Sequence, residues 1–186
     1  MLGYCLTGSF CCFKKSIEVL RSLAIEHEIM PIMSYNAYDF DTKFGKAADF
    51  NAEIKAICKK EIVHTIQGAE PIGPTGMLDC LIICPCTGNT LSKLAHGICD
   101  TPVTMAAKAH LRNGKPLVIA ISTNDGLSGS ALSLARLLQR KNIYFVPFSQ
   151  DAPTKKPCSL VCNFDKVHDT VKLALEGRQI QPILEG

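Results

Sequence analysis

Tryptophan is absent from this 186-residue sequence, and long apolar runs and paired cysteine motifs are missing as well. No segment reaches the roughly 20 apolar residues that a helix needs to span a bilayer. The N-terminus enters an apolar run at once, without the basic region and long apolar segment of a signal peptide. We therefore expect a cytoplasmic protein with no membrane partner.

The sequence also has no large excess of one sign of charge, because it contains 20 Lys and Arg residues and 17 Asp and Glu residues, a formal net charge of +3. The basic residues are scattered among acids and do not form the stripe that nucleic-acid binding requires, so we expect no nucleic-acid partner. Hydrophobic residues make up 47% of the chain and charged residues 20%, values typical of a globular protein. The length fits one domain over residues 1–186.

Cysteine is plentiful, with ten residues, but its spacing does not fit a metal site. Spacings such as Cys84-x-Cys86 form no C-x2-C knuckles, and the five His residues stand at isolated positions, so we expect no metal. Cys5, Cys80 and Cys84 lie inside apolar runs. There a free thiol behaves as a small buried hydrophobic group in a reducing compartment.

Apolar runs alternate with segments of helical periodicity, which is typical of β-α units in a parallel sheet. The middle runs are continuously apolar, as burial by helices on both faces requires. This pattern predicts a three-layer, doubly wound α/β fold of the Rossmann-like or flavodoxin-like type. The five predicted strands are Leu2–Leu6, Glu28–Met33, Cys80–Cys84, Leu117–Ile121 and Ile143–Val146.

Helices are predicted between these strands from apolar residues at helical spacing. The stripes that we assign to the core are Phe13, Ile17, Leu20 and Ala24; Ala47, Phe50, Ile54 and Ile57; and Val167, Val171, Ala174 and Leu175. A further helix is expected over Leu127–Arg140. Two segments, 67–76 and 148–157, are rich in turn-forming or polar residues, and we expect loops there.

In an open parallel sheet, ligands bind beyond the carboxyl ends of the strands, so the residues that follow each strand carry the functional information. The first strand ends in Thr7, Gly8, Ser9 and Phe10 and runs into a helix. Gly8 permits close approach of the backbone, and Ser9 with the free N–H groups of the helix start suits a phosphate. The alternative is that Ser9 is a simple N-cap.

Polar residues also follow the second and third predicted strands. Ser34 comes after the second strand and, taken alone, is a turn residue. After the third strand, Pro85 is expected to end the strand, and Thr87, Asn89 and Thr90 crowd the first turn of a helix. Three capping-type residues favour a ligand site, although an N-cap with more polar groups than it needs is the alternative.

The sequence resembles the homo-oligomeric flavin-containing cysteine decarboxylase superfamily, which also holds flavin prenyltransferases. The resemblance covers nearly the whole chain and rests on three motifs, Thr7-Gly8-Ser9, Ser34-Tyr35-Asn36-Ala37, and Pro85–Gly97 followed by Asp100. It implies FMN as cofactor, with the phosphate and ribityl chain near Gly8, Ser9, Phe10, Thr87, Asn89 and Thr90, and with Ser34 at the flavin. Ser122, Thr123 and Asn124, after the fourth strand, are expected to border the flavin ring.

Departures from the superfamily pattern bear on the reaction. The decarboxylases have a catalytic His shortly before the third strand, but Pro71–Pro74 occupies that neighbourhood here and His64 lies several residues too early. Their Pro-x-Met-Asn segment is absent, and Met105 stands where the prenyltransferases have an Arg. Neither chemistry is therefore supported, and no catalytic residue is assigned.

Glu70–Pro74 and Thr101–His110 resemble one subfamily in particular, the B subunits of a two-subunit oxidoreductase that forms a pyridine dicarboxylate during sporulation. The resemblance implies a dihydro-dicarboxylate substrate, a partner A subunit that carries NAD(P), a homo-oligomer built on trimers, and a location in the mother cell. One alternative is an FMN-dependent cysteine decarboxylase. The other is a non-catalytic module that serves the A subunit in assembly.

A dicarboxylate needs cations or helix N-termini, because burying unpaired carboxylates is costly. The nearest basic candidates are Lys43, Lys46, Lys108 and Arg112. The alternative is that all four are solvated surface charges.

Overall fold

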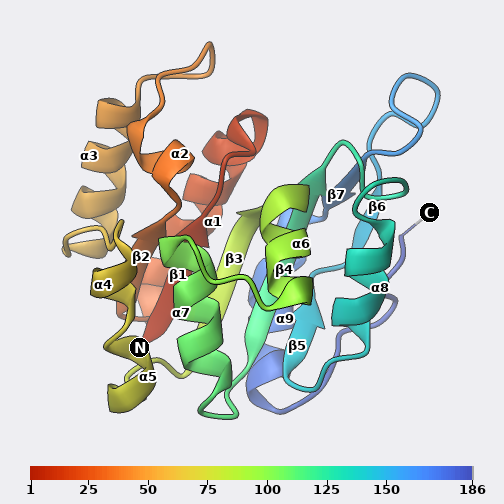
Figure 1. The fold of residues 1–186 in the computed structure, drawn as a ribbon. Helices are drawn as coiled ribbons and strands as arrows, with labels where there is room; N and C mark the ends of the chain where they lie inside the picture. Colours follow the sequence, from red (N-terminus) through yellow and green to blue (C-terminus); the bar gives the residue numbers. More distant parts are fainter. Residues whose placement is uncertain (186) are drawn as a thin grey trace.

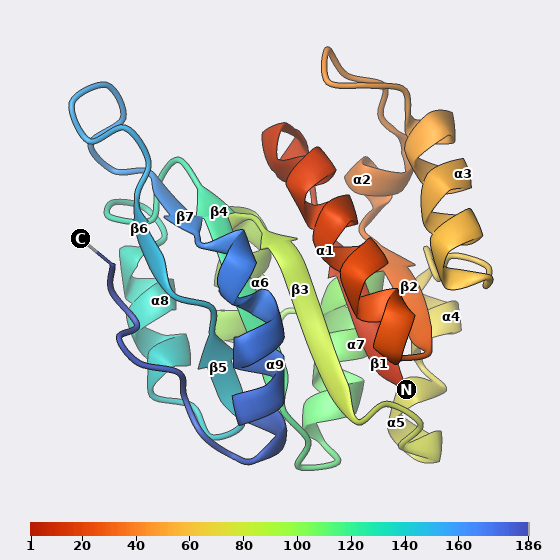
Figure 2. The ribbon, with the colours of Figure 1, turned by 180° about the vertical axis from the view of Figure 1, so that it is seen from behind.

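The computed structural model describes residues 1–185, and Gly186, the last residue of the expected domain, lies outside the described residues. A seven-stranded sheet forms the middle layer, with helices on both of its faces (Figures 1 and 2). The expected three-layer α/β fold is confirmed.

The sheet has the order β2-β1-β3-β4-β7-β6, and β5 also pairs with β4. Strands β1 to β5 pair with one another in parallel, whereas β7 runs antiparallel to both β4 and β6. The chain reverses its direction across the sheet after β2, so β1 and β3 lie side by side. The strands are β1 (Leu2–Leu6), β2 (Ile29–Met33), β3 (Cys80–Cys86), β4 (Leu117–Thr123), β5 (Ile143–Phe145), β6 (Phe148–Gln150) and β7 (Leu160–Cys162).

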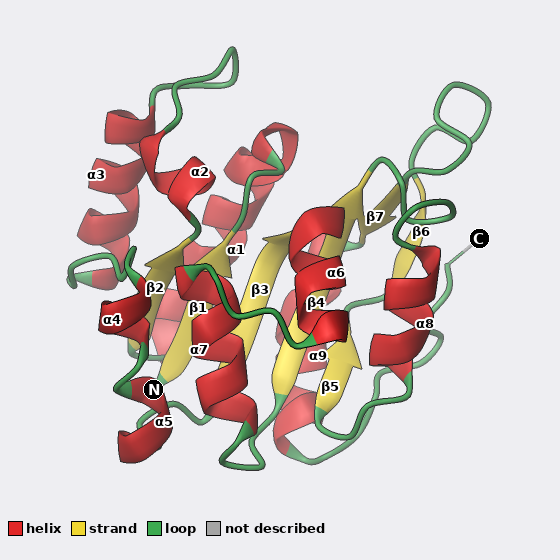
Figure 3. Ribbon diagram, viewed as in Figure 1, coloured by secondary structure: helices red, strands yellow, loops and turns green. Residues whose placement is uncertain are grey.

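Helices α1 and α9 cover one face of the sheet, and α6 and α7 cover the other (Figures 2 and 3). Helix α3 packs against α1 and β2, while α4 and α5 pack against α7 and α8 packs against α6. The helices are η1 (Phe10–Cys12), α1 (Phe13–Glu26), α2 (Tyr35–Asp39), α3 (Ala47–Cys58), α4 (Ile66–Ala69), α5 (Ile72–Thr75), α6 (Gly88–His96), α7 (Pro102–Leu111), α8 (Ala131–Leu138), η2 (Phe164–Lys166) and α9 (Val167–Leu175).

All five strands expected from the sequence are present, but the expectation that Pro85 ends the third strand was wrong. Strand β3 continues through Pro85 to Cys86. The pairing of β3 with β4 shifts in register between Ile83 and Cys86, and a proline is tolerated at such an irregularity because the ladder there needs no N–H from it. Strand β4 likewise extends two residues beyond its expected end, to Thr123.

The expected loops contain regular structure that the sequence pattern did not indicate. The turn-rich segment 67–76 holds most of α4 and all of α5, and segment 148–157 begins with β6, which pairs with β7. The helix expected over Leu127–Arg140 is shorter, because a series of turns precedes Ala131 and α8 ends at Leu138.

Buried residues of the sheet and the inner helix faces form one hydrophobic core. Cys5, Cys80 and Cys84 are fully buried in it, as expected, and the ten cysteines are free thiols. Burial raises the pKa of the Cys80 thiol to about 12 and that of Cys84 to about 11, so both stay neutral. Across residues 1–185, no helix is both long enough and apolar enough to cross a membrane.

Candidate functional site

The carboxyl ends of β1 and β3 are joined by the side chain of Thr7. This buried hydroxyl donates a hydrogen bond to the Pro85 carbonyl at 2.7 Å and accepts one from the Thr87 N–H at 3.0 Å. The turn after β1 and the start of α6 are therefore neighbours. We call this edge of the sheet, where β1, β2, β3 and β4 end, the rim; it lies at the top of Figure 1.

Ser9 ties the same turn to the end of β4. Its side chain does not cap the following helix. Instead, its hydroxyl donates to the Ser122 carbonyl at 2.6 Å, and the Ser122 hydroxyl lies 3.0 Å from the Cys12 sulfur. The simple N-cap interpretation of Ser9 therefore does not hold, and Ser122 is buried beneath the start of the first helix.

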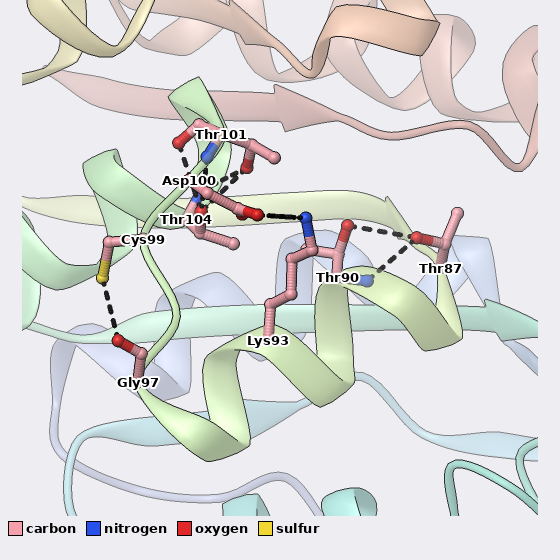
Figure 4. Close-up of polar contacts among 8 residues, drawn as sticks. All are labelled: Thr87, Thr90, Lys93, Gly97, Cys99, Asp100, Thr101 and Thr104. Atoms are coloured by element: carbon pink, nitrogen blue, oxygen red, sulfur yellow. Dashed lines mark hydrogen bonds and ion pairs between the residues drawn. The ribbon is translucent and has the colours of Figure 1, made fainter.

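Thr87 and Thr90 shape the N-terminus of α6 (Figure 4). The Thr87 hydroxyl accepts a hydrogen bond from the Thr90 N–H at 3.2 Å and donates one to the Thr90 hydroxyl at 3.1 Å. Thr87 is thus the N-cap, and Thr90 completes it. Asn89 is exposed between them, and the first N–H groups of α6 have no partner within the helix.

Asp125 is the residue of the rim that sequence reasoning missed. Its carboxylate accepts hydrogen bonds from the Thr123 hydroxyl and, at 2.9 and 3.0 Å, from the buried Ser130 hydroxyl. A Cβ atom on Gly88 would collide with the Asp125, Ser130 and Thr123 oxygens, so the acid lies directly against the first turn of α6. The turn sequence Asn124-Asp125-Gly126 directly after a strand was the available signal.

The β2 side of the rim is more open. Ser34 caps the short helix α2 by accepting from the Ala37 N–H at 3.4 Å, and its own N–H donates to the Leu6 carbonyl at 3.1 Å. A Cβ atom on Gly8 would meet only ordinary contacts, 3.6 Å from the Phe10 ring and 3.9 Å from Asn36. The Phe10 ring packs against Phe13, with 5.0 Å between ring centroids.

These positions define the electrostatics of the rim. The N-terminus of α6 carries partial positive charge and free N–H groups, which favour an anion. The Asp125 carboxylate opposes an anion on the β4 side. An anion at this helix end is therefore favoured on the side of β1 and β2, near Gly8 and Ser34.

The four cations considered for a dicarboxylate are all exposed and fall into two groups. Lys43 and Lys46 belong to the segment between α2 and α3, which projects above the rim in Figure 1. Lys108 and Arg112 are at the C-terminal end of α7, which is the end of that helix farther from the rim in Figure 1. The structure therefore does not bring the four together.

His64 and Met105 are two of the residues at which the sequence departs from the superfamily pattern. The His64 ring stacks on Tyr38 with centroids 3.9 Å apart, and its Nδ1 atom is 3.1 Å from the Ile62 carbonyl oxygen. Met105 is half-buried on α7. Because Val63 pairs in parallel with Ile32 of β2, His64 lies level with the carboxyl end of that strand. The β2 side of the rim therefore carries an imidazole, in addition to the hydroxyls, backbone N–H groups and Asp125 carboxylate described above.

The family model described as Flavoprotein matches residues 1–173. The chain belongs to the Flavoprotein family. Within it, the chain is 43% identical over 184 residues to the B subunit of dipicolinate synthase from Bacillus subtilis, covering 98% of this chain and 92% of that relative. The crystal structure of the B subunit of dipicolinate synthase from Bacillus halodurans matches with a TM-score of 0.91 and 42% identity, covering 100% of this chain and 95% of the other. The expected subfamily is thereby confirmed.

More distant Flavoprotein-like structures share the fold. The FMN-dependent cysteine decarboxylase SpaF matches with a TM-score of 0.69 and 21% identity, and DmrB of Burkholderia xenovorans in complex with FMN, a cubic protein cage, with 0.67 and 19%. Each comparison covers 94% of both chains.

Proposed function

We propose that this protein is the B subunit of a dipicolinate synthase, which forms pyridine-2,6-dicarboxylate together with an A subunit. The observation that carries the proposal is the 43% identity to the Bacillus subtilis relative over nearly the full length of both chains. Conversion of a dihydrodipicolinate-type precursor to the aromatic acid removes two electrons and two protons from the ring. We assign the NAD(P) that accepts the hydride to the A subunit, and the setting to the mother cell during sporulation.

FMN is the cofactor that we propose for the rim. The fit rests on the free N–H groups of α6, on the space beside Gly8, and on the exposed Asn89. Gly8, Ser9, Thr87, Asn89 and Thr90 would hold the phosphate and ribityl chain.

Two of the remaining positions would face the ring. Ser34 lies on the β2 side and Thr123 on the β4 side, and Phe10 would stay with the phosphate and ribityl chain. Ser122 is buried against Cys12, so it would support the ring only through its carbonyl, which accepts from Ser9. When bound, FMN supplies two-electron redox chemistry. The DmrB complex with FMN, which shares this fold, supports the assignment.

We also propose a homo-oligomer built on trimers. Exposed aromatic side chains stand on and beyond α2, where Tyr35, Phe40 and Phe44 are 40%, 54% and 43% exposed. A second chain packed there would complete the wall of the rim. The cubic cage of DmrB supports an oligomer in this fold.

Reconstitution tests the proposed reaction. The two purified subunits, together and separately, are supplied with the dihydro precursor and NAD(P)⁺, and the aromatic product is followed by its ultraviolet absorbance. We expect product only when both are present. If the A subunit without its partner formed product as fast as the pair, the proposal would be contradicted.

Two other functions remain distinguishable. In the non-catalytic module, the Gly8→Val variant would lose flavin absorbance while the two-subunit complex kept full activity. An FMN-dependent cysteine decarboxylase would release CO2 from a cysteinyl substrate. His64 lies several residues before the place where the decarboxylases have their catalytic His, so the sequence gives that reaction no support.

A further inference from the structure

A cavity of about 320 Å³ lies between the C-terminal half of α6, helix α7 and the end of α8. This volume is at the lower end of the range for small-molecule sites. Three apolar and three cationic side chains stand out in its lining, namely Leu94, Ile98 and Leu111, and Lys108, Arg112 and Arg140. No lining residue within the described chain is acidic.

The three cations have no acidic partner. Over residues 1–185, none of them takes part in an ion pair. The acid of the adjoining loop, Asp100, is already held by the Lys93 ammonium at 2.8 and 2.9 Å, as Figure 4 shows. All three are exposed, so water and salt screen their mutual repulsion, and a bound anion would offset what remains.

Two of the cations are positioned by the backbone around them. The Arg140 guanidinium donates to the Leu94 carbonyl at 3.3 Å, which leaves its other N–H groups free for a ligand. Nη2 of Arg112 lies against Gly73 of α5, a residue outside the cavity lining, where a Cβ atom would be only 2.8 Å away. This guanidinium therefore reaches a ligand in the cavity by a change of side-chain rotamer. Arginine matches planar carboxylates because its N–H groups form a rigid fork.

We propose that this cavity binds a small organic dianion, with its carboxylates at Lys108, Arg112 and Arg140 and its carbon skeleton against Leu94, Ile98 and Leu111. The apolar wall favours an organic dicarboxylate over inorganic phosphate, because every phosphate oxygen needs a hydrogen-bond donor when it is buried. Leu94, the lining residue on α6, follows Gly88 by six residues, which is about 9 Å along the helix at 1.5 Å per residue. The cavity is therefore a second site, separate from the flavin positions.

Isothermal titration calorimetry of the full-length protein in metal-free buffer tests the site. The probes are pyridine-2,6-dicarboxylate, pyridine-2-carboxylate and inorganic phosphate; only the choice of the first probe rests on the proposed function. We expect the dicarboxylate to bind one per chain and at least tenfold more tightly than the other two. Arg112→Met and Arg140→Met should each weaken binding roughly ten- to hundredfold.

Lys141→Met is the matched control, because it removes an exposed positive charge next to Arg140 from a residue outside the cavity lining. It should leave the dicarboxylate affinity unchanged. Lys108→Met, on the exposed surface of α7, replaces the arginine variants if these unfold. The site is refuted if the dicarboxylate does not bind, if phosphate binds more tightly, or if the cavity variants behave like the control.

The same proteins separate this proposal from the proposed synthase function. Loss of dicarboxylate binding in the cavity variants, with no product from the wild-type pair of subunits, supports the site and refutes the synthase. Product from that pair, with no dicarboxylate binding to this chain in isolation, supports the synthase and refutes the site.

Discussion

The contact between Gly88 and Asp125 gives a quantitative test of how the rim is built. A Cβ atom on Gly88 would overlap the Asp125 carboxylate and lie 2.5 Å from the Ser130 hydroxyl and 2.6 Å from the Thr123 hydroxyl. These oxygens are held in place by their own hydrogen bonds, so they cannot simply rotate away. Gly88→Ala must therefore shift either α6 or the turn after β4.

The magnitude follows from two opposing effects. Overpacking of this kind costs about 1–3 kcal/mol, and the better helix propensity of alanine offsets up to about 1 kcal/mol. We expect a net loss of about 1–2 kcal/mol, which for a chain of this length lowers Tm by about 2–8 °C. Because the chain has no Trp, unfolding is followed by far-ultraviolet circular dichroism at a fixed protein concentration.

A double-mutant cycle identifies the cause. Asp125→Ala removes the nearest obstacle to Gly88→Ala, so the two changes together should destabilise by at least about 1 kcal/mol less than their sum. Asp125→Asn keeps the volume of the side chain and serves as the control. Its effect on the free energy of unfolding and that of Gly88→Ala should simply add. An unchanged Tm in Gly88→Ala, or additivity in both cycles, would refute the reasoning.

Three further predictions concern the rim and the buried titrating groups. The added methyl group of Gly8→Ala meets no close contact, so the stability of this variant should stay within about 0.5 kcal/mol of wild type. The larger side chain of Gly8→Val should weaken FMN binding at least tenfold in a flavin fluorescence titration. Equal FMN affinities of wild type and Gly8→Val would remove Gly8 from the site. Burial raises the pKa of Cys80 and Cys84. The stability that these neutral thiols contribute is therefore full below the ordinary thiol pKa of 9.0 and is lost as pH rises from there towards 11 to 12. The urea midpoint should fall over that range, and a midpoint that does not fall would contradict this. Burial lowers the pKa of His110, so the stability that its neutral ring contributes is full above pH 6.5 and is lost as pH falls through the lowered pKa. His110→Gln should therefore flatten the fall of the urea midpoint on the acid side. An unaltered slope of the urea midpoint against pH would contradict this.

The sequence was sufficient to predict the parallel strands of the sheet, because each of them lies in a largely apolar run. Leu2–Leu6, for example, is buried at every position, and such a run is visible without any tertiary information. Strands β6 and β7 have only three residues each and contain polar or half-buried positions, so no periodicity could distinguish them from a loop. Their pairing depends on β4, which is distant in the sequence.

The rim was predictable only where its chemistry is local. Thr87 caps the helix that follows it, and the sequence pattern indicated such a cap directly. The partner of Ser9 is Ser122, 113 residues away, so nothing near Ser9 could reveal that its hydroxyl serves the end of β4 and not the first helix. The contact of Asp125 with Gly88 is also long-range, and it exists only because β3 and β4 are neighbours in the sheet.

The two ends of α6 have different electrostatic environments, so each end suits a different kind of anion. At the N-terminus, free N–H groups attract an anion, while Asp125 restricts it to the side of Gly8 and Ser34. At the C-terminus the helix dipole is unfavourable to anions, so binding there depends on side-chain charge, which Arg112 and Arg140 supply. A phosphate that needs several backbone donors suits the first end, and a carboxylate that pairs with guanidinium groups suits the second. A flavin at the rim and a dicarboxylate in the cavity could therefore occupy one chain together without competing.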